Sequence, residues 1–201
     1  MFKSMTTSLK PRYIPLVQKP FCCNVTCLAM ILYRRGYGLF DQEKLAKFFD
    51  VRVSPEARKT FTVRLGLYSS VGFDEGIKTI ESAALVNQFF RKQKISLLAT
   101  AVRASEIKDL NRFITKHLNA NDDLWIEYKT FPIHGGSFIH DNVIESIQVS
   151  NGSTRAVLVD PDGQLRTRTS VPLSAIKEAI SHKHGRETGF IVIRQSNENL
   201  I

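Results

Sequence analysis

The sequence lacks any long apolar run and has few cysteines, and both absences narrow the class of protein. No stretch of the chain approaches the roughly 18 consecutive apolar residues of a membrane-spanning helix. Residues 1–10 contain no apolar core of a secretion signal, so we expect a cytoplasmic protein without a membrane span. The three cysteines all lie within residues 22–27, and an odd number this closely spaced predicts reduced thiols rather than a disulfide framework.

A basic motif interleaved with aromatic residues is also absent, although the formal net charge is +9. The 28 Lys and Arg residues are spread along the chain, with small clusters only at residues 34–35, 91–92 and 183–186. This spacing is typical of a solvated basic surface, and we expect no nucleic-acid partner. An acidic partner or a membrane surface is the alternative explanation of the charge.

The remaining composition is that of an ordinary globular protein, with 43% hydrophobic and 23% charged residues. A chain of 22.8 kDa is long enough to bury one core, so we expect a single domain over residues 1–201. The sequence contains no internal repeat and no low-complexity linker that would divide it.

The first part of this domain, about residues 16–120, is predicted to be mainly helical. From Val25 the apolar residues recur at the spacing of one buried helical face, and Gly36 supplies a stop. Asp41 can cap a second helix. Helices are therefore predicted from Val25, over residues 42–49, over 77–92 and over 105–118, whereas residues 1–17 form an extended lead-in and residues 51–76 give no strong prediction.

The second part, about residues 121–195, changes to strand patterns. Strands are predicted over residues 124–129, 143–149, 155–160 and 189–194, with one further helix over residues 172–180. Asn151-Gly152, between the second and third of these strands, is a strong hairpin signal. Helices followed by an antiparallel sheet predict an α+β domain.

The stretch over residues 18–36 combines an amide, three thiols and a helix start. Cys23 is predicted at the helix N-terminus, where unpaired N–H groups and the helix dipole lower a thiol pKa from about 8.5. Gln18 on the incoming loop can fold back and donate its amide to an oxyanion, which is what acyl-transfer chemistry needs. Cys22 is assigned to that loop. Cys27, one turn deeper, is assigned to the core with a raised pKa.

Two other interpretations of the cysteines remain open. Free cysteines are commonly small buried hydrophobes, so all three thiols can belong to the core. A metal site is less favoured, because the Cys-Cys-x-x-x-Cys spacing lacks the usual Cys-x-x-Cys pair and no His is near in sequence.

A thiolate nucleophile requires a base and a group that orients the base. His140 opens a predicted strand and Asp160 ends the strand across the hairpin, so the two side chains can meet. His134, on the preceding Gly-bounded loop, is a rival base, whereas His117, His182 and His184 are assigned to helix surfaces. Each side chain has an ordinary alternative: His140 as a surface or satisfied histidine, Asp160 as a β-turn residue. The order Gln, Cys, His, Asp favours the site.

In this order the chain resembles the papain-like cysteine peptidases of the bacteriocin-processing, double-glycine-leader type and their stand-alone relatives, over about residues 15–194. Three places depart from the family pattern: Cys22 replaces an Asp, Asn24 replaces the Gly after the nucleophile, and Asp141-Asn142 replace aromatic or aliphatic residues after the His. The matching residues are Gln18, Cys23, Cys27-Leu28-Ala29-Met30-Ile31-Leu32, His140, Val143-Ile144-Glu145-Ser146-Ile147 and Asp160-Pro161-Asp162-Gly163.

The resemblance implies a papain-like fold and a stand-alone thiol hydrolase that needs no cofactor or metal and acts on a peptide or protein substrate. It assigns Cys23 as nucleophile, His140 as base, Asp160 as the residue that orients the base, and Gln18 with the Cys23 backbone N–H as oxyanion donors. An acyl transferase using the same site is an alternative. A catalytically inactive binding module for a peptide or partner protein is another, supported by Asn24 and the polar residues after His140.

Overall fold

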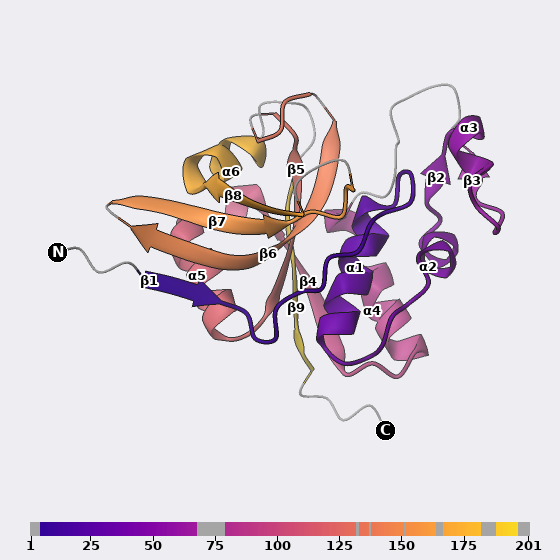
Figure 1. Ribbon diagram of the computed structural model, residues 1–201. Helices are drawn as coiled ribbons and strands as arrows, with labels where there is room; N and C mark the ends of the chain where they lie inside the picture. The colour runs from indigo at the N-terminus through magenta and orange to yellow at the C-terminus, as the bar shows by residue number, and fades with distance from the viewer. Residues whose placement is uncertain are drawn as a thin grey trace.

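The computed structural model describes residues 5–67, 79–131, 133–136, 138–150, 152–163, 167–181 and 188–196. Within these residues a seven-stranded antiparallel sheet has the order β4-β9-β5-β6-β7-β8, and β1 also pairs with β6 (Figure 1). Its strands are β1 (Met5–Ser8), β4 (Leu97–Arg103), β5 (Asp123–Lys129), β6 (Ile139–Ser150), β7 (Ser153–Val159), β8 (Arg168–Pro172) and β9 (Gly189–Gln195).

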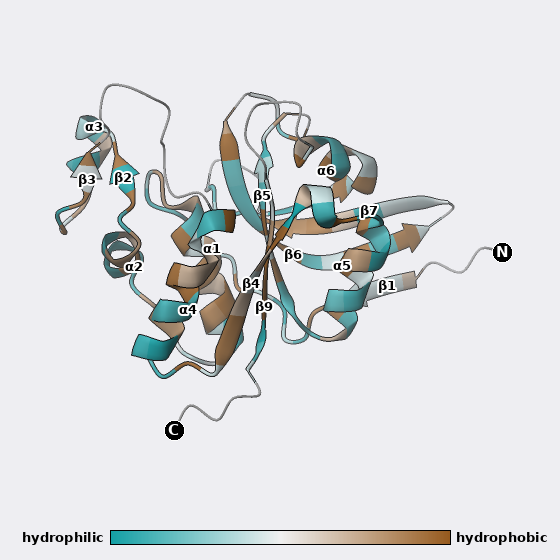
Figure 2. Ribbon diagram, turned by 180° about the vertical axis from the view of Figure 1, so that it is seen from behind, coloured by the Kyte–Doolittle hydropathy of each residue, from teal (hydrophilic) through white to brown (hydrophobic). Residues whose placement is uncertain are grey.

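Helices flank the sheet on both sides. Figure 2 shows α1 (Cys23–Arg34) and α4 (Ala83–Lys92) on one side of the central strands, and α5 (Leu110–Asn119) and α6 (Leu173–Ala179) on the other. Helix α1 is buried along nearly its whole length against β5 and β6. The shorter elements are α2 (Gln42–Phe48), β2 (Arg52–Val53), α3 (Pro55–Arg58), β3 (Gly66–Leu67) and the 3-10 helices η1 (Ile80–Ser82) and η2 (Ala104–Glu106).

The α+β class and the antiparallel sheet agree with the prediction from sequence. The predicted helices and strands are present, with shifted ends. One shift has a clear cause: the helix expected from residue 105 begins at Leu110, because Asp109 caps it by accepting a hydrogen bond from Arg112 N at 3.0 Å. Residues 77 and 78 of another predicted helix, and Asn151 of the hairpin, lie outside the described residues.

The predicted helical part, about residues 16–120, also contains β4, which belongs to the main sheet. Two further strands were not predicted: β1, within the extended lead-in, and β8, just before α6. In β4 the run Leu-Leu-Ala-Thr-Ala-Val-Arg lacks a clean two-residue alternation, because burial along this edge strand is irregular. Its pairing with β9, nearly a hundred residues later, is a non-local contact that local patterns do not encode.

A buried charge cluster anchors the C-terminal end of α1. Asp123 Oδ1 accepts hydrogen bonds from Arg34 Nε at 2.7 Å and from Tyr13 OH at 2.6 Å. Asp123 Oδ2 accepts from Arg35 Nε at 2.6 Å. Asp123 is fully buried, so its charge depends on these donors. The cluster therefore ties the N-terminal segment, α1 and β5 together.

A second buried carboxylate holds the N-terminal segment across the sheet. Glu145 lies at a register shift of β6 and is fully buried. It accepts hydrogen bonds from Arg12, from Arg168 Nε at 3.0 Å and from Tyr13 N at 3.2 Å. The segment that leads into Gln18 is thus fixed to β6 and β8 before it reaches α1.

Replacing Asp123 tests the anchor of α1. We expect Asp123→Ala to lower the free energy of unfolding by about 3–5 kcal/mol, because it leaves the buried Arg34 without its counter-charge. The matched control is the neighbouring Asp122→Ala, whose ion pair with His117 lies nearer the surface and should cost below about 1 kcal/mol. Urea unfolding measures both values, and equal losses in the two variants would contradict the anchoring role.

Candidate active site

The start of α1 places Cys23 in the first helical turn. Cys22 is the N-cap residue, and its N–H donates to Lys19 O at 3.0 Å, which closes a turn just before the helix. Within that turn Phe21 has φ 62, a left-handed conformation that bulky residues rarely adopt. The chain therefore bends sharply ahead of the helix, and Cys23 lies where the sequence predicts it.

The three thiols are free and differ in exposure. Cys22 and Cys27 are fully buried, whereas Cys23 is partly buried. Burial raises the pKa of Cys22 to about 12 and raises the pKa of Cys27 well above its ordinary value. The predicted lowering of the Cys23 pKa is wrong: burial and the nearby charge of Asp141 raise it well above its ordinary value. Backbone hydrogen bonds of Asn24, at the helix start, and of Asp141, on β6, lower the Cys23 pKa, but by less.

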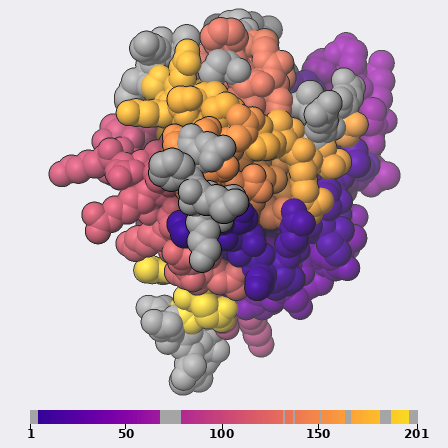
Figure 3. All heavy atoms as spheres, turned by 60° about the vertical axis from the view of Figure 1, so that its left-hand side comes forward, coloured from indigo at the N-terminus to yellow at the C-terminus, as the bar shows by residue number. Residues whose placement is uncertain are grey.

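The loop that carries Gln18 is clamped on both sides of that residue. Gln42 Nε2 donates to Val17 O at 2.8 Å, and Gln42 Oε1 accepts from Lys19 N at 2.9 Å. Gln18 N itself donates to Pro161 O at 2.8 Å, beside Asp160. Figure 3 shows the indigo N-terminal segment lying against the orange surface of the C-terminal strands. The structure therefore brings the Gln18 loop next to the Asp-Pro turn.

The side chain of Gln18 is placed but not bonded. Its Oε1 is buried without a hydrogen-bond partner, and in the described part of the chain Nε2 has no hydrogen bond either. An amide whose N–H groups are unused retains its capacity to donate to a ligand. The sequence predicts Gln42 only as the first residue of a helix. Its clamp depends on tertiary contacts between α2 and the loop, so no local signal indicates it.

The β6–β7 hairpin joins His140 to Asp160. Val143 lies opposite Val159, so Asp160 lies opposite Asn142, on the face of the sheet that His140 shares. His140 Nε2 lies 2.8 Å from Asp160 Oδ1, and both residues are buried. Asp160 is held in turn, because Oδ1 accepts from Asp162 N at 2.8 Å and Oδ2 accepts from Asn142 Nδ2 at 3.2 Å.

The other histidines are less well placed. His134 Nε2 lies 3.4 Å from Asp160 Oδ2 and 3.0 Å from Tyr128 OH, so it borders the same carboxylate at a longer distance. Burial lowers the pKa of His134. His117 pairs with Asp122 at the end of α5, at 2.8 Å. His182 and His184 lie outside the described residues.

The thiol of Cys23 bonds to Asp141, the residue that follows His140 in the sequence. Cys23 Sγ donates to Asp141 Oδ2 at 3.5 Å. Within the described residues no hydrogen bond joins Cys23 to His140, although His140 is the neighbour of Asp141 on β6. Asp141 is buried beside β5, where Trp125 Nε1 donates to its Oδ1 at 2.9 Å. The sequence did contain a signal for this role: Asp141 is a charged residue within a strand whose other residues are mostly buried.

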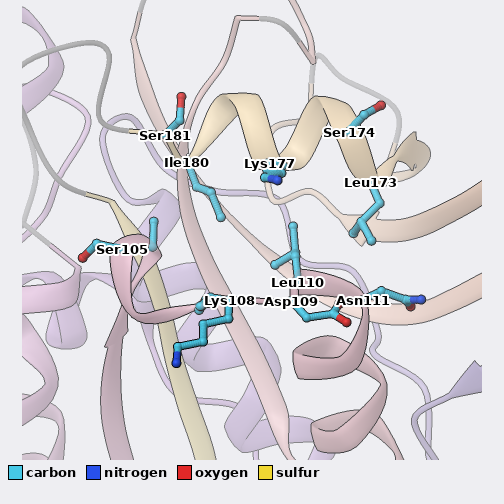
Figure 4. A pocket seen from close by; sticks show the side chains of 12 residues that line it. Ser105, Lys108, Asp109, Leu110, Asn111, Leu173, Ser174, Lys177, Ile180 and Ser181 are labelled. Atoms are coloured by element: carbon cyan, nitrogen blue, oxygen red, sulfur yellow. The ribbon is translucent and has the colours of Figure 1, made fainter.

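Two hollows in the surface differ in the residues that line them. A cavity of about 540 Å³ lies between α5 and α6, where Leu110 faces Leu173 and Ile180 (Figure 4), and no candidate site residue lines it. A second hollow of about 610 Å³ borders the Gln18 loop and is lined in part by Leu16, Val17 and Lys19. The second hollow thus lies beside the loop that carries Gln18, although none of the candidate site residues lines it.

Three further observations bear on the site. Among the described residues, His, Cys, Asp and Glu side chains do not gather in a group of three that could hold a metal ion. The helices in this same part of the chain are too short or too polar to cross a membrane. Neither a protein-family model nor a curated protein matches this chain. The candidate site is therefore supported by its own residues and their geometry.

Alkylation of the native protein tests the ranking of the three thiols. We expect iodoacetamide to modify Cys23 first, because it alone is partly exposed, and to modify Cys22 and Cys27 only after unfolding. Because the pKa of Cys23 is raised, its rate should increase steeply from about pH 6 to about pH 9. Peptide mapping by mass spectrometry locates the adduct. An adduct chiefly on Cys22 would contradict the assignment.

Proposed function

We propose that this protein is a thiol hydrolase of papain-like fold that cleaves an amide bond in a peptide or protein substrate. The observation that carries the proposal is the hydrogen bond between His140 Nε2 and Asp160 Oδ1, at 2.8 Å. It uses one ring nitrogen and leaves Nδ1 to act on a proton. The thiol of Cys23 lies beside this strand, bonded to the residue that follows His140.

The fold supports the same proposal. A buried helix that begins with the thiol packs against β6, the strand that begins with the histidine. The next strand, β7, ends just before the acid. This is the arrangement that the resemblance to papain-like peptidases implies, with the site between a helix start and a sheet end.

In the first chemical step Cys23 loses its proton to Nδ1 of His140, and the thiolate attacks the carbonyl carbon of the substrate. The negative charge that forms on the carbonyl oxygen requires donors. The unused amide of Gln18 and the backbone N–H of Cys23 supply them. The C–N bond then breaks, the leaving amine takes the proton from His140, and a thioester to Cys23 remains.

In the second step water resolves the thioester. His140 removes a proton from the water, the hydroxide adds to the acyl carbon, and the sulfur leaves with the proton returned to it. Asp160 fixes the ring in both steps by its bond to Nε2 and stabilises the positive charge that forms on the ring. An amine that replaces the water makes the same site an acyl transferase.

Peptide cleavage tests the proposed function. Wild-type protein and Cys23→Ser are incubated separately with a complex mixture of peptides, and new termini are identified by mass spectrometry. We expect new termini in the wild-type sample and none with Cys23→Ser, because the serine hydroxyl is a much weaker nucleophile than a thiolate. Identical peptide mixtures in both samples would count against a peptidase.

A binding module is the second candidate, and one observation favours it. The Cys23 thiol bonds to Asp141 rather than to His140, and its pKa is raised, so the thiol at rest is protonated. A site that never forms the thiolate can still bind a peptide in the hollow beside the Gln18 loop. In that case peptides from the same mixture are retained by immobilised protein but are not cleaved.

Replacing each histidine identifies the base. We expect His140→Ala to reduce turnover by about 10³-fold or more, because it removes proton transfer to and from the thiol. His134→Ala should leave turnover nearly unchanged, because His134 lies on the other oxygen of Asp160, at a longer distance. The rate is measured on a peptide cleaved by the wild type. The reverse ranking would move the base to His134.

Replacing Asp160 separates orientation from nucleophilic attack. Asp160→Asn keeps an oxygen that can accept from His140, so we expect part of the turnover to remain, whereas Cys23→Ser should have none. Circular dichroism serves as the control for folding in both variants. A loss of folding confined to Asp160→Asn would instead make Asp160 a structural turn residue.

A further inference from the structure

Asp141 is a buried acid in contact with the nucleophile, and the mechanism above does not use it. Its Oδ1 accepts hydrogen bonds from Thr79 Oγ1 at 2.7 Å and from Trp125 Nε1 at 2.9 Å. Its Oδ2 faces the Cys23 thiol at 3.5 Å. Asp141 is only 2% exposed, so water does little to screen its charge. Two donors therefore fix this carboxyl with one oxygen directed at the sulfur.

A carboxylate in this position opposes thiolate formation. Both groups become negative when they lose a proton, and two adjacent negative charges disfavour each other in a buried site. Burial raises the pKa of Asp141, and the charge of Asp141 raises the pKa of Cys23. The pair therefore holds one negative charge before it holds two, and the thiol keeps its proton.

We propose that Asp141 is a positioning residue that holds the Cys23 thiol in a protonated resting state, which must lose its proton before the sulfur becomes a nucleophile. This inference deepens the proposed function and rests on it for its role in catalysis. In the proposed first step the proton passes from sulfur to Nδ1 of His140, the electron pair stays on sulfur, and Asp141 neither gains nor loses a proton.

Other titratable groups surround this pair, but Asp141 alone among the described residues accepts the thiol hydrogen bond. The charge of His140 lowers the pKa of Asp141. The pKa values of Cys27 and Tyr128 are raised in part by the charges of Cys23 and Asp141, so these groups disfavour further negative charge. The groups that face the pair are His140 of β6, Asp160 after β7, Cys27 of α1, Tyr128 of β5, and Glu127 of β5, which accepts from Thr79 N.

Asp141→Asn tests the proposal, because it removes the charge and keeps an oxygen for Thr79 and Trp125. We expect the pH midpoint for iodoacetamide alkylation of Cys23 to fall by about one pH unit or more. At about pH 7 the alkylation rate should rise about tenfold. Asp162→Asn removes the same charge from the turn after Asp160 and is the matched control, for which the midpoint should stay unchanged.

A double variant tests whether His140 accepts the proton of the Cys23 thiol. If the gain in alkylation rate depends on proton transfer to His140, Asp141→Asn with His140→Ala should lose that gain, because only solvent then remains to accept the proton. Retention of the full gain in the double variant would overturn the transfer to His140. An unchanged or raised midpoint in folded Asp141→Asn would overturn the resting-state role altogether.

A second single variant keeps the test valid if Asp141→Asn does not fold. Thr79→Val preserves the side-chain shape but removes a donor that favours the charged form of Asp141. The pKa of Asp141 should rise further, and alkylation of Cys23 should become faster; an unchanged rate overturns the proposal. Alkylation needs no substrate, so the two proposals can fail separately. A shifted midpoint without peptide cleavage contradicts only the proposed hydrolase function. Peptide cleavage with an unchanged midpoint contradicts only the proposed role of Asp141.

Discussion

The antiparallel pairing of β6 is the constraint on which the candidate site depends. This strand of 12 residues pairs with β5, β7 and β1, so its register is fixed from both sides. Because side chains alternate between the faces of a strand, that register assigns consecutive residues to opposite faces. His140 therefore meets the acid after β7, while Asp141 meets Trp125 and the thiol at the start of α1. A slip of one residue would exchange the two side chains and dismantle both contacts.

The features that the sequence predicted are those with local causes. The apolar period from Val25 and the stop at Gly36 indicate α1, and Gly36 has the positive φ of 83 that such a stop requires. The hairpin signal at residues 151–152 predicted that β6 and β7 pair, and their pairing brings His140 to Asp160. Periodicity and turn chemistry act over a few residues, so both can be recognised in one sequence.

The features that escaped prediction are non-local. Gln42 clamps the Gln18 loop only because α2 packs beside it, and the edge strand β4 is defined by a partner far along the chain. The predicted direction of the pKa shift of Cys23 was wrong for a related reason. A helix start lowers a thiol pKa through local backbone groups. The burial of Cys23 and the charge of Asp141 are tertiary effects that raise its pKa, and here they are larger.

The hydrogen bond from Gln18 N to Pro161 O has a consequence for how the chain can vary. It fastens the loop before α1 to the turn after β7, and Val17 fills the space that any side chain at Gly163 would occupy. The two loops are therefore matched in length and shape, although more than a hundred residues separate them. An insertion in one of them would displace the amide and the carboxylate together. Tolerated variants should carry compensating changes in both loops, or none in either.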